Sequence, residues 1–155
     1  LRRGRAMAGP PRVELEALRR EHWGQGFPEL LGQLTALGEV TEAMFAARLA
    51  EVDAAPGHHV VVAVDRARGR VVGAATLLEE GKFARGCGRC GHIEDVVVDA
   101  AARGQRIGQR LVDHLTAAAA ASGCYKVILD CAEANVGFYE KCGFSRKEVQ
   151  MAKYF

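Results

Sequence analysis

The sequence has 155 residues, of which 49% are hydrophobic and 26% charged, and its formal net charge is +2. These values are ordinary for one soluble globular domain. So small a net charge predicts no nucleic-acid partner, and the lack of an apolar run near the ~20 residues that span a bilayer predicts no membrane partner.

The ends of the chain and the cysteines lead to further expectations. Residues 1–11 are expected to form a flexible tail and residues 12–155 one domain. The five cysteines have irregular spacing, which does not fit a secreted disulfide framework and favours a reducing compartment. We therefore expect the protein to be located in the cytoplasm, although an organelle-targeting signal on further terminal residues stays open. Cys87-Gly88-Arg89-Cys90 lacks a second ligand pair, so we expect no metal.

The first predicted elements are a strand and two helices. Residues 12–18 have a strand pattern that continues into a short helix. Residues 27–37 are expected to be helical, because leucines recur there at helical spacing and Gly38 follows. Thr41 is a suitable N-cap for a second helix that reaches residue 53. The residues expected to face inward from that helix are Met44, Phe45 and Leu49.

A hairpin is predicted next, from two valine-rich runs at residues 59–65 and 70–79. Residues 81–91 contain four glycines and are expected to form a loop. Residues 93–98 are a further strand candidate.

The last part alternates helices and strands. Arg103 opens a predicted helix to residue 122, with Ile107, Leu111, Leu115 and Ala118 on its apolar face. The remaining predictions are a strand at residues 125–131, a short helix at 135–142 and a last strand at 145–154. Together the elements predict an α/β (α+β) fold, in which a mixed central β-sheet is flanked by helices and contains a parallel β-α-β unit.

The stretch after the third predicted strand carries the clearest chemical signal. Val96-Val97-Val98 is followed, at the predicted helix start, by Arg103-Gly104-Gln105-Arg106-Ile107-Gly108. Free N–H groups and the helix dipole make such a start an anion site, and the arginines add positive charge. The glycine spacing fits neither a Walker loop nor a dinucleotide fingerprint. Taken alone, the stretch is equally compatible with a pyrophosphate site and with a plain helix start carrying solvated arginines.

This loop resembles the R/Q-x-x-G-x-G/A acetyl-CoA loop of the GNAT superfamily of N-acetyltransferases, with Arg106 in place of the usual central glycine. Over residues 27–151 the chain is similar to one of its families, the glucosamine-6-phosphate N-acetyltransferases. The matching motifs are Leu31-Gly32-Gln33-Leu34-Thr35, Gly81-Lys82-Phe83, Glu94-Asp95-Val96-Val97-Val98, and the runs at residues 124–131 and 135–144.

The resemblance implies a GNAT fold, with acetyl-CoA as the co-substrate between two splayed parallel strands. It implies cofactor contacts at Val96, Val97, Val98, Arg103, Gly104, Gln105, Arg106, Ile107, Gly108, Asn135, Tyr139, Glu140 and Lys141. It also implies that glucosamine 6-phosphate is the acceptor, in UDP-N-acetylglucosamine biosynthesis. The implied substrate contacts are Thr35, Lys82, Phe83, Ala84, Arg85, Glu94, Asp95, Val96, Tyr125 and Lys126.

The chemistry of direct transfer agrees with these residue types. Carboxylates at Glu94, Asp95 and Asp130 can orient an amine and attract its proton, and the Tyr139 hydroxyl can protonate the leaving thiolate. Because successive strand residues point to opposite faces, only one of Glu94 and Asp95 is expected to face the substrate with its side chain. Each of these residues also has an ordinary structural interpretation, as a surface carboxylate or a half-buried tyrosine.

One departure from the family concerns the C-terminus. The resemblance implies a homodimer, in which an Arg near the C-terminus usually reaches the sugar phosphate of the partner subunit, whereas this chain has Lys153 and Tyr154 there. Two alternatives to this function stay open. The chain could be an acetyltransferase of the same superfamily whose acceptor is another small amine, a polyamine or a peptide, or it could be a non-catalytic acyl-CoA-binding module. The basic Lys82, Arg85 and Arg89 favour an anionic acceptor.

Overall fold

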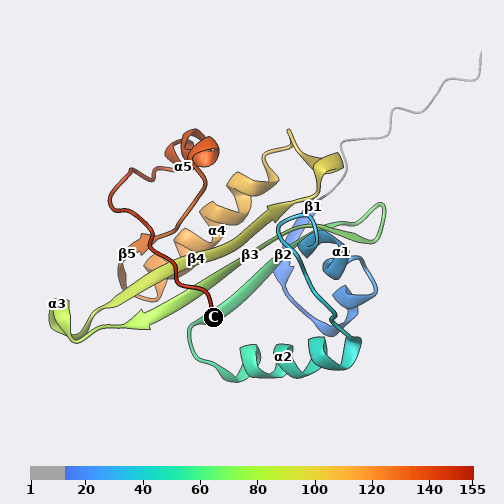
Figure 1. The fold of residues 1–155 in the computed structure, drawn as a ribbon, viewed down its shortest axis with the longest axis horizontal. Helices are drawn as coiled ribbons and strands as arrows, with labels where there is room; N and C mark the ends of the chain where they lie inside the picture. The colour runs from blue at the N-terminus through green and yellow to red at the C-terminus, as the bar shows by residue number, and fades with distance from the viewer. Residues whose placement is uncertain (1–12) are drawn as a thin grey trace, which may run out of the picture.

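The computed structural model describes residues 13–155, so the predicted tail lies outside the described residues. Within them, one sheet has the strand order β1-β2-β3-β4-β5 (Figure 1). The strands are β1 (Val13–Ala17), β2 (His58–Asp65), β3 (Arg70–Gly81), β4 (Arg89–Val98) and β5 (Cys124–Ile128). The first four pair antiparallel, and β5 pairs parallel with β4, as predicted for the β-α-β unit.

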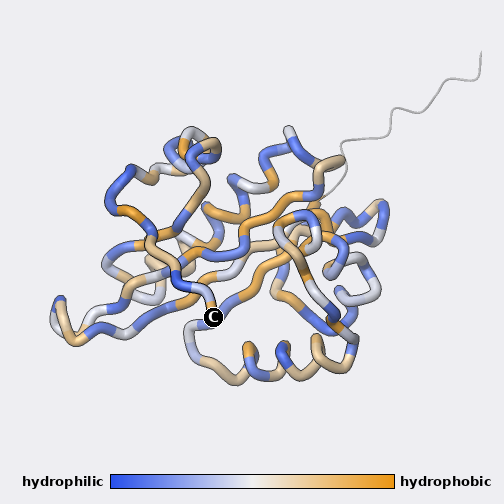
Figure 2. Tube along the Cα trace, viewed as in Figure 1, coloured by the Kyte–Doolittle hydropathy of each residue, from blue (hydrophilic) through white to orange (hydrophobic). Residues whose placement is uncertain are grey.

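Helices cover both faces of the sheet (Figure 1). The helices α1 (Phe27–Leu31) and α2 (Glu42–Ala54) pack on one face, where Phe27, Leu30 and Phe45 join the β2 and β3 valines in a buried cluster. The longer α4 (Ile107–Ala121) packs on the other face. Figure 2 shows hydrophobic residues gathered along the central strands between these layers.

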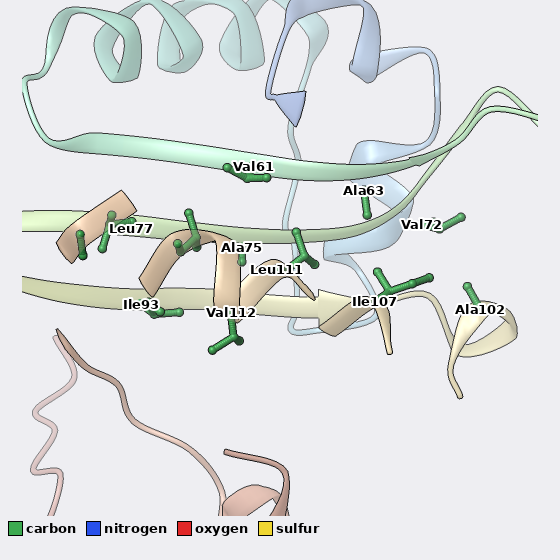
Figure 3. Packing of buried hydrophobic residues seen from close by; sticks show 12 residues of the cluster. Val61, Ala63, Val72, Ala75, Leu77, Ile93, Ala102, Ile107, Leu111 and Val112 are labelled. Carbon is green, nitrogen blue, oxygen red and sulfur yellow. The ribbon is translucent and has the colours of Figure 1, made fainter. Parts of the chain in front are cut away.

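The apolar face of α4 belongs to the larger of the two core clusters (Figure 3). Ile107, Leu111 and Leu115 recur at helical spacing and are at most 2% exposed, packed against Ala75, Leu77 and Ile93 of the sheet. Burying each of these side chains contributes about 1.5–3 kcal/mol, so α4 is held by its packing rather than by its alanine-rich sequence alone.

The first predicted helix is shorter than expected. It ends at Leu31 with Gly32 as its C-cap, and Leu34 is exposed. Glycine loses more conformational entropy in a helix than other residues, and the later leucines find no core to pack against. In α2, Thr41 Oγ1 accepts a hydrogen bond from the Met44 N–H at 3.2 Å, which confirms the predicted cap. The inward position predicted for the Met44 side chain is wrong, because it is 54% exposed.

Three further boundaries differ from the predictions. The segment predicted as a loop at 81–91 is a long β3–β4 hairpin, in which Gly81 pairs with Arg89 around the short turn α3 (Ala84–Cys87). The predicted helix at Arg103 begins only at Ile107, since residues 100–102 form a separate turn, η2 (Ala100–Ala102), capped by Asp99. β5 ends at Ile128, so residues 129–131 follow the strand rather than extend it.

The predicted last strand is absent. After α5 (Val136–Lys141), residues 144–155 contain no regular element, and Val149, Met151 and Tyr154 are largely exposed. A strand needs a neighbour to take up its backbone hydrogen bonds, and this segment pairs with no strand of the described chain. Among the helices of residues 13–155, none combines the length and apolarity needed to cross a membrane.

Candidate functional site

The parallel strands β4 and β5 separate in the middle of β4. Their pairing runs from Arg89 opposite Cys124 to His92 opposite Ile128 and ends there. β4 continues to Val98 with β3 as its neighbour, so its last residues face no strand on the β5 side within the described chain. The structure thus has a divergence of two parallel strands at the place where the sequence predicts cofactor contacts from Val96, Val97 and Val98.

A β-bulge lies at the start of this divergence. Glu94 pairs with Thr76 and Val97 with Ala74, so Asp95 and Val96 together oppose Ala75. Asp95 has a φ of 51°, in the left-handed region. A bulge interrupts the alternation of side chains and redirects them. The regular alternation on which the expectation for Glu94 and Asp95 depends is thus interrupted after Glu94, and both residues are exposed.

The carboxylates affect one another at this point. Partial burial raises the pKa of Glu94, and the negative charges of Asp130 and Asp95 raise it further, while His92 opposes them. Asp130 follows the carboxyl end of β5, which brings it beside β4 although it is far away in the sequence. A carboxylate with a raised pKa is better able to accept a proton near neutral pH. The three predicted acidic residues thus form one electrostatic group.

Tyr139 lies on α5, half-buried between two other rings. Its ring makes edge contacts with Phe138, at 4.9 Å between centroids, and with Phe144, at 6.2 Å. Burial raises the pKa of the Tyr139 hydroxyl, with a further contribution from Cys131 and Cys142. No group of the described chain forms a hydrogen bond with this hydroxyl. A protonated hydroxyl that is held in place and has no partner can act as a proton donor.

The start of α4 has the features of an anion site. Its N-cap, Arg106, has a left-handed backbone with φ 58° and makes no side-chain capping hydrogen bond. The first N–H groups of a helix have no partner within it, so they point outward with the positive end of the dipole. Gly104 also has a positive φ, of 82°, and open space around it, which suits close approach of a ligand. Arg103 is exposed, and its Nε donates to the Val98 carbonyl at 3.3 Å.

The last residues of the predicted loop have a different role. Ile107 belongs to the core, and a Cβ on Gly108 would come within 3.1 Å of Phe138 and 3.4 Å of Val98. Gly108 therefore lets α5 pack against α4, and this contact fixes Tyr139 relative to the helix start. The remaining residues predicted to touch the cofactor are exposed near these elements: Gln105, Asn135, Glu140 and Lys141.

The predicted substrate-binding cations gather farther back along the sheet. Arg85 lies over the Tyr125 ring at 5.4 Å, and Lys126 Nζ lies 5.8 Å from the same ring. Lys126 is in register with Cys90, four residues before Glu94, which corresponds to roughly 13 Å of strand. The Lys82 Nζ pairs with Glu80 at 2.6 Å instead of standing free. Two further predicted contacts there, Phe83 and Ala84, are exposed at the hairpin tip.

Thr35 is exposed in the connection after α1, and a neighbouring residue ties that connection to the end of β4. Gln33 Nε2 donates to Asp99 at 3.1 Å, and Gln33 Oε1 accepts from the Ala100 N–H at 3.0 Å. Gln33 is not among the predicted site residues. Its partners lie more than sixty residues away, so no local pattern could have revealed the contact. The clamp brings the Thr35 segment to the region between β4 and α4.

Two other features do not coincide with this site. A cavity of about 540 Å³ is lined by the end of α2, the start of β2 and His114 on α4. No predicted site residue lines it. Among the described residues, the one group of three side chains close enough to share a metal ion is Glu16, Glu21 and His22, which contains neither Cys87 nor Cys90. The C-terminal residues Lys153 and Tyr154 are exposed.

Comparisons with known proteins agree with this architecture. A model of the acetyltransferase (GNAT) family matches residues 15–144. A protein of Arabidopsis thaliana named glucosamine 6-phosphate N-acetyltransferase is 46% identical over 84% of this chain and 89% of its own length. One of Oryza sativa named glucosamine 6-phosphate N-acetyltransferase 1 is 52% identical over 84% of this chain and 80% of its own length.

Two solved structures show that the similarity extends to the fold. The crystal structure of glucosamine-6-phosphate N-acetyltransferase from Arabidopsis thaliana superimposes with a TM-score of 0.91 at 43% identity, covering 93% of this chain and 99% of that one. A Trypanosoma brucei acetyltransferase structure superimposes with a TM-score of 0.87 at 38% identity, covering 93% and 100%. The splayed strands, the uncapped helix start and these similarities lead to one conclusion: the chain belongs to the acetyltransferase (GNAT) family.

Proposed function

We propose that this protein is a glucosamine 6-phosphate N-acetyltransferase, which transfers the acetyl group of acetyl-CoA to the 2-amino group of the sugar. The similarity to proteins of that name, at 46% and 52% identity over 84% of the chain, carries the proposal. The arrangement of Glu94, Asp130 and Tyr139 around the divergence of β4 and β5 supports it.

In this proposal acetyl-CoA lies between β4 and β5. The uncapped N–H groups at the start of α4, with Arg103 and Arg106 beside them, would bind the pyrophosphate. The open surroundings of Gly104 fit a ligand there. The last residues of β4 face no strand of the described chain on the β5 side, so they can receive the acyl arm. Acetyl-CoA supplies the activated acyl group, and the reaction needs no metal.

Two side chains of the protein, Glu94 and Tyr139, then carry out the two proton transfers of the reaction. The acceptor enters as an ammonium ion and must lose a proton before its nitrogen can attack the thioester carbonyl. Glu94 accepts that proton, because its raised pKa makes it a stronger base than an ordinary glutamate. The nitrogen forms the new C–N bond, the C–S bond breaks, and Tyr139 gives its proton to the leaving sulfur.

An anionic acceptor is supported by the basic end of the site. Arg85 and Lys126 are exposed around Tyr125, and charge-assisted hydrogen bonds from such groups suit a phosphate. Lys82 would have to share Glu80 with the phosphate or leave it.

A homodimer is part of the same proposal. Val149 and Met151 are 84% and 88% exposed in a segment whose strand pattern finds no neighbour among residues 13–155 of its own chain. Docking of this segment on a second copy would bury its apolar side chains. It would also bring Lys153 toward the acceptor site of the partner.

Release of CoA thiol tests the proposal. Acetyl-CoA would be mixed with glucosamine 6-phosphate, glucosamine, spermidine or a lysine peptide, and the free thiol measured. We expect release with glucosamine 6-phosphate at least tenfold faster than with the others, and loss of that release in the Glu94→Gln variant. Release with another amine alone would identify a different acetyltransferase, and acetyl-CoA binding without release would identify a non-catalytic module.

A further inference from the structure

His92 stands at the last point where β4 and β5 pair. Its Nε2 lies 2.9 Å from Glu80 Oε2 on β3, and its side chain is 28% exposed. On the other side of β4 it is in register with Ile128. His92 is thus held on the sheet surface at the mouth of the strand divergence, and neither the cofactor contacts nor the acceptor contacts proposed above include it.

His92 and Glu94 lie on the same face of β4. Ile93, between them, is 2% exposed and packs toward α4, so its two neighbours project from the opposite face. His92 pairs with Leu78 and Glu94 with Thr76, so the strand is regular up to Glu94 and the bulge begins after it. Residues two apart on a strand are about 7 Å apart, close enough for a charge on one to act on the other.

Glu80 holds His92 in place. The hydrogen bond from Lys82, together with that from His92, lowers the pKa of Glu80, so Glu80 stays ionised and accepts from both. With Nε2 bonded to Glu80, the second ring nitrogen, Nδ1, has no partner among the described residues. The charged and titratable groups around His92 and Glu94, from all three strands and the segments that follow them, are Glu80, Lys82, Cys90, Asp95, Tyr125, Lys126 and Asp130.

We propose that His92 is a positioning residue for the acetyl transfer: anchored by Glu80, its positive form holds Glu94 in the carboxylate state that receives the proton of the acceptor. Without this cation, burial, Asp130 and Asp95 would act on Glu94 unopposed, and all three favour its protonated state. The proton moves from the acceptor nitrogen to a Glu94 oxygen, and His92 gains and loses nothing in the step. The inference rests on the role of Glu94 in the proposed function.

His92→Gln tests this, since glutamine keeps an N–H donor for Glu80 and cannot carry a charge. A unit charge about 7 Å away in a water-like surrounding corresponds to about 0.4 pH unit. Removing a positive charge makes protonation of Glu94 easier, so the acid limb of kcat/KM should move up by about 0.4 pH unit. The rate should fall about 2.5-fold below that limb and stay unchanged above it. An equal loss at every pH would show a merely structural role and overturn the proposal.

Glu80→Gln is the second variant. Because it alters an exposed residue, it tests the role of His92 even if His92→Gln does not fold. It should move the acid limb in the same direction, and the double variant should move it no further than His92→Gln does. Independent, additive effects would overturn the proposal. His114→Gln is the matched control, because His114 is an exposed α4 residue that is not among the groups around Glu94, and it should leave the profile unmoved.

A titration of Glu94 separates this inference from the proposed function. With ¹³C-labelled glutamate carboxyls, the Glu94 midpoint should be about 0.4 pH unit higher in His92→Gln than in the unaltered protein. Identical midpoints would overturn the inference. Absence of thiol release with glucosamine 6-phosphate would overturn the proposed function instead, and the titration would still decide the role of His92.

Discussion

His22 is fully buried, and its Nε2 lies 2.7 Å from a carboxylate oxygen of Glu16. The other ring nitrogen accepts a hydrogen bond from the Arg19 N–H at 2.8 Å. Nε2 therefore carries the ring proton and donates a hydrogen bond to Glu16. Arg66 donates to the second oxygen of Glu16. With both ring nitrogens engaged, the cluster with Glu21 links β1 to the turn η1 (Arg20–Trp23) and is not arranged as a metal site.

The first prediction concerns this link. Glu16→Gln should lower the free energy of unfolding at pH 7 by about 2 kcal/mol, because it weakens hydrogen bonds to a charged group and leaves a buried histidine poorly paired. Urea titrations would measure the change. Glu21→Gln is the control and should change stability by less than about 0.5 kcal/mol, since its exposed ion pair with Arg19 contributes little.

Glu16 should also make the stability of the protein depend on pH. Burial alone would raise the pKa of Glu16, but the hydrogen bonds from His22 and Arg66 outweigh burial and lower it below 4.5. A lowered folded pKa gives stability that is present above the unfolded pKa and is lost as the pH falls through the folded one. The unaltered protein should therefore lose its advantage over Glu16→Gln as the pH falls below about 4.5. A constant difference from pH 7 down to pH 3 would contradict this.

Tyr139→Phe tests the proton donor. We expect turnover to fall about 10²-fold, which is typical for loss of a general acid, with the acetyl-CoA dissociation constant changed less than about twofold. Because the pKa of Tyr139 is raised, the basic limb of kcat that this hydroxyl sets should lie above the ordinary value of 10.0. Rates and calorimetric binding would be measured over pH 6 to 10.5. Unchanged turnover throughout would rule out the role.

Substitutions at Arg106 can separate the effect of its backbone strain on stability from the effect of its positive charge on acetyl-CoA binding. A non-glycine residue with φ 58° costs about 1 kcal/mol, so Arg106→Gly should raise stability, measured as a higher Tm. Arg106→Ala is the matched control, because it removes the same charge and keeps the strain. Both variants should weaken acetyl-CoA binding equally if Arg106 acts through its charge. A Tm that falls in Arg106→Gly as much as in Arg106→Ala would contradict the strain argument.

The sequence predicted the order of elements because apolar periodicity and capping are local. Thr41 and the leucines of α4 show this directly, since each acts within a turn or two of its own helix. The divergence of β4 from β5 could be inferred only through resemblance to a family. It depends on where pairing stops, at His92 and Ile128, and no local pattern encodes that position.

The site residues show the same division. Tyr139 and the loop at residues 103–108 could be chosen from motifs, whereas the bulge at Asp95 became visible only in the register with β3. Lys82 was expected to contact the acceptor, but Glu80, two residues earlier in the chain, pairs with it. The clamp made by Gln33 and the anchor of His92 both need contacts between distant strands, which a single sequence does not display.

The exposed C-terminal segment leads to the last prediction. Replacing Val149 and Met151 together by Asp should convert a homodimer into a monomer, because charges would then occupy side chains that a partner is proposed to bury. The control replaces Gln150 and Ala152 by Asp, which adds the same charge at the alternate positions of a strand. Light scattering after size exclusion would give the mass of each. A monomeric unaltered protein, or equal loss of the dimer in both variants, would argue against docking through the apolar face of this segment.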